Sequence, residues 1–265
     1  MNVRMPAVAG SFYPNNVEQL QRQLANFLDE APVDDIVPNA LIVPHAGYCY
    51  SGAIAGHAFS YLQKSKNTIK RVILLGPSHR VPLRGCAVPS SAVFVTPLGD
   101  INIDQSACQQ LQMLGLANCS EQAHEWEHAL EVQLPFLQTS LNKFDLIPIV
   151  VGACQPEVVA TLLNTLLSEQ AQNTLIIVST DLSHYHPYDE AQVLDNDTIM
   201  RILALASDIA PENACGCYAL NGLLNFSAQQ AWQIKLISKA NSGDSKEVVS
   251  ANKSQVVGYA SFILY

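Results

Sequence analysis

Three histidines follow short apolar runs at the points where those runs end. His45 comes directly after 40–44 (ALIVP), His79 lies three residues after 71–76 (RVILLG), and His184 lies five residues after 174–179 (TLIIVS). A single histidine in such a place is usually an ordinary loop residue, but three equivalent places among seven histidines indicate a shared site. Because imidazoles bind metals and also exchange protons near neutral pH, the pattern predicts either a metal site or an acid–base site.

A carboxylate and a thiol fall close to the same pattern. Asp181 lies three residues before His184, and Cys215 precedes the helical pattern of 217–228. A thiol at a helix N-terminus is expected to have a lowered pKa, because unpaired N–H groups and the helix dipole favour the thiolate. Cys215 is therefore either a thiolate ligand, a redox-active group or a small packed residue, whereas Cys217 is expected to be structural.

The segment 127–141 carries a further polar set on a helical pattern. Glu127, His128 and Glu131 are spaced so that all three can share one face of a helix. That face is either part of a pocket wall or an ordinary solvated acidic surface, and the spacing differs from the H-E-x-x-H pattern of zinc proteases. Of the remaining histidines, a core position is expected for His57 and surface positions for His124 and His186.

Apolar runs alternate with helical patterns along most of the chain. This alternation is typical of an α/β fold, and we expect a mixed, mostly parallel central sheet flanked by helices on both faces. In such sheets ligands bind beyond the carboxyl ends of the strands, which is where the histidines fall. Strands are predicted at 40–44, 71–76, 144–152 and 174–179, helices at 15–30, 51–65, 104–114, 127–141, 156–170, 188–206 and 217–228, and an antiparallel pair at 232–240 and 255–264.

The composition excludes several classes of protein. The chain has 265 residues, 14% of them charged, a net charge of −9 and no Lys/Arg cluster, which argues against a nucleic-acid partner. Its apolar runs are all shorter than the roughly 18–20 residues of a membrane span, and the start of the chain does not resemble a signal peptide.

The cysteines indicate the cellular location of the protein, and the lack of linkers in the sequence indicates its number of domains. Seven scattered cysteines without C-x-x-C pairs do not form a disulfide framework or a zinc ribbon. We therefore expect a cytoplasmic protein without a membrane partner. The chain has no Pro/Gly/Ser-rich linker and no repeat, and this predicts one domain over residues 1–265.

Six stretches, in order along the chain, resemble the Memo family, whose bacterial members are also called protein B of the AmmeMemoRadiSam system. Each stretch alone is a modest signal, but six in sequence make the resemblance specific. They are AGSFYP (9–14), PHAGYCYSG (44–52), LGPSHRVPLRG (75–85), EHALEVQLPF (127–136), STDLSH (179–184) and CGCYALNGLLN (215–225).

The resemblance implies a fold like that of the class III (LigB-type) extradiol dioxygenases, which are non-heme iron enzymes. It also implies that His45, His79 and Cys215 hold a metal, with Asp181 and His184 as catalytic groups in the same pocket. The dioxygenases bind iron through two histidines and a glutamate, whereas the resemblance implies that the third ligand in this chain is the thiolate of Cys215. Sulfur favours copper(I), zinc or a differently tuned iron, so the expected cofactor is iron or copper, with zinc as a further option.

Three functions fit this resemblance, and the residues themselves leave a fourth open. The first is a metal-binding redox protein or non-heme metalloenzyme that carries out an oxygen-dependent reaction on a small aromatic or other organic substrate. The second is a non-catalytic binding protein that retains a dioxygenase-like pocket, and the third is a component that works with an AMMECR-like protein and a radical SAM enzyme. The fourth is a hydrolase with Cys215 as nucleophile. Ring opening itself does not carry over, because the same fold supports many reactions.

Overall fold

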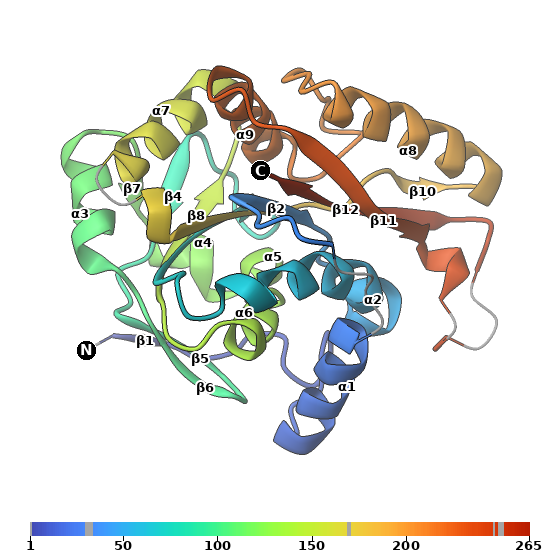
Figure 1. Cartoon of the computed structure of the whole chain (residues 1–265), viewed down its shortest axis with the longest axis horizontal. Helices are drawn as coiled ribbons and strands as arrows, with labels where there is room; N and C mark the ends of the chain where they lie inside the picture. Colours follow the sequence, from blue (N-terminus) through green and yellow to red (C-terminus); the bar gives the residue numbers. More distant parts are fainter. Residues whose placement is uncertain (1, 30–33, 169–170, 246, 249–251) are drawn as a thin grey trace.

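A large mixed β-sheet forms the centre of the computed structural model, with helices on both of its faces (Figure 1). The structure describes residues 2–29, 34–168, 171–245, 247–248 and 252–265, and the predicted ends of helices 15–30 and 156–170 lie outside these ranges. The strand order is β10-β12-β2-β9-β3-β8-β4-β7, with β11 paired to β12. The bounds of these strands are β2 Ala40–Val43, β3 Arg71–Pro77, β4 Cys86–Val88, β7 Asn118–Cys119, β8 Asp145–Val151, β9 Thr174–Ser179, β10 His184–His186, β11 Ile234–Asn241 and β12 Val256–Leu264.

Four parallel strands make up the middle of this sheet. β2, β9, β3 and β8 are rich in Val, Ile and Leu, and nearly all of their residues are buried. Such runs are typical of parallel strands that are covered on both faces. The register pairs Val43 with Ser179, Leu75 with Val178 and Pro77 with Val151, so the carboxyl ends of the four strands lie at one edge.

Both flanks of the sheet depart from the parallel pattern. β12 joins β2 in antiparallel orientation, and β11 and β10 both pair antiparallel with β12. On the other side, β4 pairs antiparallel with β8 and parallel with β7. The expected α/β class, the mixed central sheet and the antiparallel tail pair are confirmed, but parallel pairing predominates only in the middle of the sheet.

Helices cover both faces of the sheet (Figure 1). α2 packs against β2, β11 and β12 with α1 outside it, while α9 packs against β3 and β9 with α7 outside it, and α8 covers β11 and β12. The helices are α1 Val17–Asp29, α2 Tyr48–Phe59, α3 Gln105–Met113, α4 Glu121–Glu125, α5 His128–Glu131, α6 Leu134–Ser140, α7 Pro156–Leu167, α8 Tyr188–Leu203 and α9 Cys217–Gln229. Short 3₁₀ turns lie at η1 Ser60–Ser65, η2 Ala171–Asn173 and η3 Ser242–Asp244, and a small sheet is formed by β1 Val3–Arg4, β5 Val93–Thr96 and β6 Gly99–Asn102.

Two glycines allow α1 to approach α2 closely. A Cβ atom at Gly52 would lie 2.4 Å from Phe27 Cε2, and one at Gly56 would lie 2.6 Å from Phe27 Cβ. Both distances are shorter than a van der Waals contact, so the Phe27 ring at Gly52 and the Phe27 Cβ and backbone at Gly56 occupy the space that a larger residue would need. Because α2 begins directly after the segment that carries His45, this contact also holds that segment in place.

The segment predicted as one helix over 127–141 is two short helices. α5 ends at Glu131 and α6 begins at Leu134, with Pro135 in its first turn. Proline has no N–H to donate to the preceding turn, so a continuous helix through this point is disfavoured. Within the part of the chain that the structure describes, no helix has both the length and the apolar composition needed to cross a membrane.

Candidate metal centre

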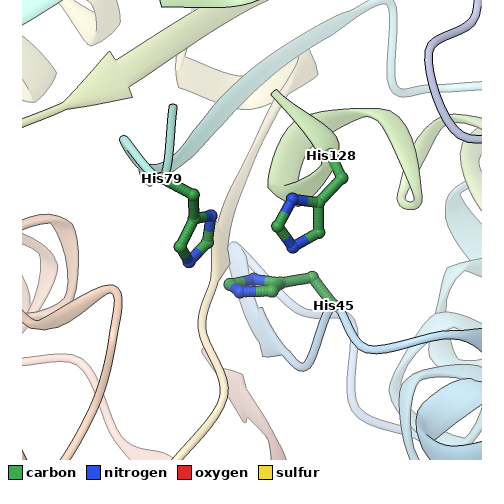
Figure 2. Close-up of side chains that lie close together, drawn as sticks. All are labelled: His45, His79 and His128. Carbon is green, nitrogen blue, oxygen red and sulfur yellow. The ribbon is translucent and has the colours of Figure 1, made fainter. Parts of the chain in front are cut away.

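Three imidazoles from three separate segments meet at the carboxyl edge of the parallel strands. His45 lies in the loop after β2, His79 in the loop after β3 and His128 at the start of α5, and Figure 2 shows their rings facing one another. One ring nitrogen from each lies within 4.8 Å of the corresponding nitrogen of the other two. The ring centroids are 5.2 Å apart for His45 and His79 and 4.6 Å apart for His79 and His128. Such a group can hold a metal ion.

His45 is held so that one of its nitrogens remains available. Its Nδ1 lies 2.9 Å from Ser179 Oγ, and that hydroxyl donates its single proton to the Ala129 carbonyl at 2.7 Å. Ser179 Oγ must therefore accept from His45 Nδ1–H, as it also accepts from Gln133 Nε2 at 2.9 Å. This assigns the tautomer and leaves the lone pair on His45 Nε2. Burial lowers the pKa of His45 well below its usual value, so the ring is neutral, as metal binding requires.

Glu127 orients the His79 ring in the way that Ser179 orients the His45 ring. Its carboxylate accepts the His79 ring Nδ1–H at 2.8 Å and the His79 backbone N–H at 2.6 Å, and it also accepts the Ala129 N–H at 2.9 Å. Burial opposes ionisation of Glu127, but the His79 contacts and the two backbone N–H groups outweigh it and lower the pKa of Glu127 to about 2. A carboxylate behind a histidine that leaves Nε2 free is a common arrangement in metal sites.

His128 carries a buried nitrogen that lacks a hydrogen-bond partner. Its Nδ1 lies 3.4 Å from Glu127 Oε1, but the pair does not have hydrogen-bond geometry. Burial, followed by the neighbouring His45 and His79, lowers the pKa of His128 to about 4, so this ring is also neutral at pH 7. The Phe12 ring packs against it at a centroid distance of 4.8 Å. A His128 ring nitrogen within 4.8 Å of nitrogens from two oriented imidazoles fits a metal ligand.

Cys215 lies next to the available ring nitrogen of His45. Its Sγ is 3.2 Å from His45 Nε2 and accepts the Asp181 backbone N–H at 3.3 Å. The expectation of a lowered thiol pKa was wrong. α9 begins only at Cys217, and burial of the sulfur, together with the Asp181 charge, raises the pKa of Cys215 despite the N–H contact. The thiol proton therefore remains on sulfur and faces the Nε2 lone pair.

The loop between β9 and β10 carries Asp181, and β10 begins with His184, so both residues lie beside the imidazoles. Asp181 is 4% exposed, and its Oδ1 accepts the His45 backbone N–H at 2.8 Å. Burial raises the pKa of this carboxyl group. Asp181, His184 and His128 all line one cavity of about 400 Å³, which is within the range of small-molecule sites.

Glu131, on the same short helix as His128, anchors the chain's N-terminal segment. Its carboxylate is fully buried and forms an ion pair with Arg4 at 2.9 Å. It also accepts the backbone N–H groups of Ala7 and Val8 at 2.7 and 2.9 Å and the Tyr13 hydroxyl at 2.7 Å. Residues 7–13, including the Phe12 that packs on His128, are thereby held over the site.

The structure thus brings together every residue singled out for the site. In the predicted ligand set, the His79 ring and the Cys215 sulfur both lie next to His45. The group of three converging ring nitrogens, however, contains His128 in place of Cys215. The spacing of Glu127, His128 and Glu131 had suggested a pocket wall without separating their roles. Cys217 is buried, as expected, whereas the surface position predicted for His124 is wrong, because its ring is 1% exposed and bonds to the Ala87 carbonyl.

The family model and the most similar curated proteins agree on one family. The family model described as "Memo-like protein" matches residues 4–263. A MEMO1 family protein from Aquifex aeolicus is 34% identical over 99% of both chains, and one from Methanosarcina mazei is 33% identical over the full length of both. The crystal structure of an uncharacterized protein from Escherichia coli K12 covers 84% of this chain and 98% of its own, with a TM-score of 0.55 and 10% identity, which shows similarity of fold alone.

We expect Glu131→Gln to destabilise the protein strongly. The amide cannot neutralise Arg4, and breaking a buried ion pair by removing one partner costs about 3–5 kcal/mol. Thermal or urea denaturation measures the loss. Glu125→Gln, at an exposed position on α4, is the matched control and should change stability little. A loss below about 1 kcal/mol for Glu131→Gln, the size of an exposed pair, would contradict the anchoring role.

Proposed function

This chain belongs to the Memo family, and on that premise we propose that it is a metal-binding redox protein whose ion is held by His45, His79 and Cys215. The observation that carries the proposal is the arrangement around His45 Nε2. That lone pair faces the Cys215 sulfur at 3.2 Å, and the other ring nitrogen is committed to Ser179. A metal ion that replaces the thiol proton gains a thiolate and an oriented imidazole together.

The donor set favours a particular group of metals. Imidazole nitrogens suit iron, copper and zinc, and a thiolate sulfur shifts the preference toward copper(I), zinc or an iron of altered potential. We propose iron or copper, and the His128 ring nitrogen that lies within 4.8 Å of those of His45 and His79 supports a further nitrogen ligand in the same group. An iron or copper ion supplies one-electron and O₂ chemistry when it is bound.

The chain's own residues supply the other requirements of a reaction. Asp181 and His184 lie on the wall of the cavity that includes His128, where they can accept or donate a proton to a bound molecule. Phe12 and the segment held by Glu131 limit the access of water from one side. We propose that a small aromatic or other organic molecule occupies this cavity and that His184 acts on it as acid or base, assisted by Asp181.

The same contact between Cys215 and His45 supports a second candidate, a thiol nucleophile with an imidazole base. A pair at 3.2 Å, with the base oriented by a third group, is the usual arrangement for such catalysis. Here the third group is Ser179 rather than a carboxylate, and two more imidazoles converge beside the pair. The convergence of three imidazoles favours metal binding over hydrolysis.

The seven free cysteines support a cytoplasmic location. Cys49, Cys119 and Cys154 each retain some exposed surface, and all seven cysteines are unpaired. Thiols are kept reduced in the cytosol, whereas secreted proteins usually carry disulfides.

Ligand substitutions test the proposed metal site. Protein purified without chelator should contain about one ion per chain, and His45→Ala and Cys215→Ala should each reduce that content at least tenfold, because each removes a direct ligand. His186→Ala and Cys119→Ala are matched controls, since both residues are partly or fully exposed and lie outside the group. Mass spectrometry of the metal content provides the measurement.

The same samples separate the two candidates. If Cys215 is a ligand, a bound ion should protect it from alkylation by iodoacetamide. Unchanged metal content in His45→Ala and Cys215→Ala, together with alkylation that is independent of metal, would favour the nucleophile over the ligand.

Glu127→Gln should weaken metal binding without removing a ligand. The amide cannot replace the carboxylate behind His79, and losing such a partner typically reduces metal affinity about 10- to 100-fold. A competition titration with a chromophoric chelator measures the affinity, and Glu125→Gln serves as the control. Equal affinities for the two variants would show that Glu127 does not orient a ligand.

A further inference from the structure

The cavity beside the imidazoles has a wall rich in aromatic side chains. Phe12, Tyr50, Tyr185 and Tyr259 line it, together with Val248 and Val257. Aromatic rings offer large flat apolar surfaces, and pairs of rings in offset or edge-to-face contact are stabilised beyond their buried area. The wall therefore fits a molecule with a flat apolar face.

The same wall is poor in positive charge. No Lys or Arg occurs among the described residues that line the cavity, and its polar members include the uncharged Ser242, Asn252 and Gln255. Lys253, the neighbour of Asn252, has its ammonium group 4.4 Å from the centre of the Tyr188 ring. The wall does carry one carboxylate, Asp181. An anionic ligand would lose hydration without gaining a Lys or Arg partner, and this is costly in a partly buried site.

Tyr185 has an unusual conformation for a residue on this wall. Its φ is 63°, in the left-handed region that favours glycine, and its side chain is 70% exposed. The pairing of β10 with β12 is irregular between His184 and His186, so the bulge turns Tyr185 outward next to His184, with the two rings 5.8 Å apart. A strained, exposed aromatic residue beside a binding cavity is a candidate for a functional role.

We propose that this cavity binds an uncharged organic molecule with a flat apolar face and that Tyr185 determines its selection by covering that face. The proposal rests on the same site as the proposed function but requires only the side chains of the cavity wall. Binding can therefore be measured on protein freed of metal, so that failure of the metal assignment and failure of the ligand class are separate results.

The test uses three phenyl probes of similar size and different charge. Phenol, benzoate and phenyl phosphate are titrated into the metal-free protein at pH 7 and followed by ligand-observed NMR. Phenol should bind at least tenfold more tightly than either anion. Absence of phenol binding, or equally tight binding of benzoate, overturns the proposed class, and preferential binding of phenyl phosphate would instead indicate a site for phosphorylated ligands.

Substitutions at Tyr185 test its role separately from folding. Tyr185→Gly removes the ring and suits a positive φ, so the variant should be at least as stable as the parent protein. It should nevertheless bind phenol about five- to tenfold more weakly, the size of one lost aromatic contact. Tyr185→Phe should retain binding, and Trp126→Ala, which removes an exposed aromatic side chain outside the cavity, should not change it. Unchanged phenol affinity in Tyr185→Gly overturns the role of Tyr185.

Discussion

The parallel register of four buried strands is the constraint on which the site depends. Because β2, β9 and β3 end at the same edge, the residues that follow them lie close together although they are up to 139 positions apart in the chain, from His45 to His184. A one-residue shift in any strand would turn its side chains to the opposite face. The apolar residues of these strands therefore fix the site's geometry as well as the core.

Two buried glutamates hold side chains and backbone in place at this edge. Glu127 orients the His79 ring, while Glu131, four residues later, binds Arg4 and the backbone of residues 7–8. One short helix thus ties the N-terminal segment to the loop after β3 and also supplies His128. Buried carboxylates are costly unless their oxygens are paired, and here each accepts several N–H or O–H groups.

Much of this arrangement could be predicted from the sequence, since strand ends and histidines are both visible in it. The α/β class and four central strands follow from apolar runs bounded by helical patterns. The alternating runs of the tail predicted the antiparallel pair β11 and β12, but the antiparallel pairing of β4 with β8 was less accessible, because its direction depends on long-range contacts. His128 was also missed as a member of the imidazole group, since its position depends on how α5 packs against β3 and not on the end of a strand. The pKa of Cys215 was misjudged because its burial is a tertiary effect that opposes the effect of the helix terminus.

X-ray absorption spectroscopy of the metal-loaded protein tests the central claim most directly. The account predicts one sulfur neighbour at about 2.3 Å, as for thiolates in zinc sites, together with imidazole nitrogens from at least two histidines. The sulfur contribution should disappear in Cys215→Ala. A coordination shell of nitrogen and oxygen alone in the unsubstituted protein would contradict the assignment of Cys215 as a ligand, and a shell without imidazole would contradict the site as a whole.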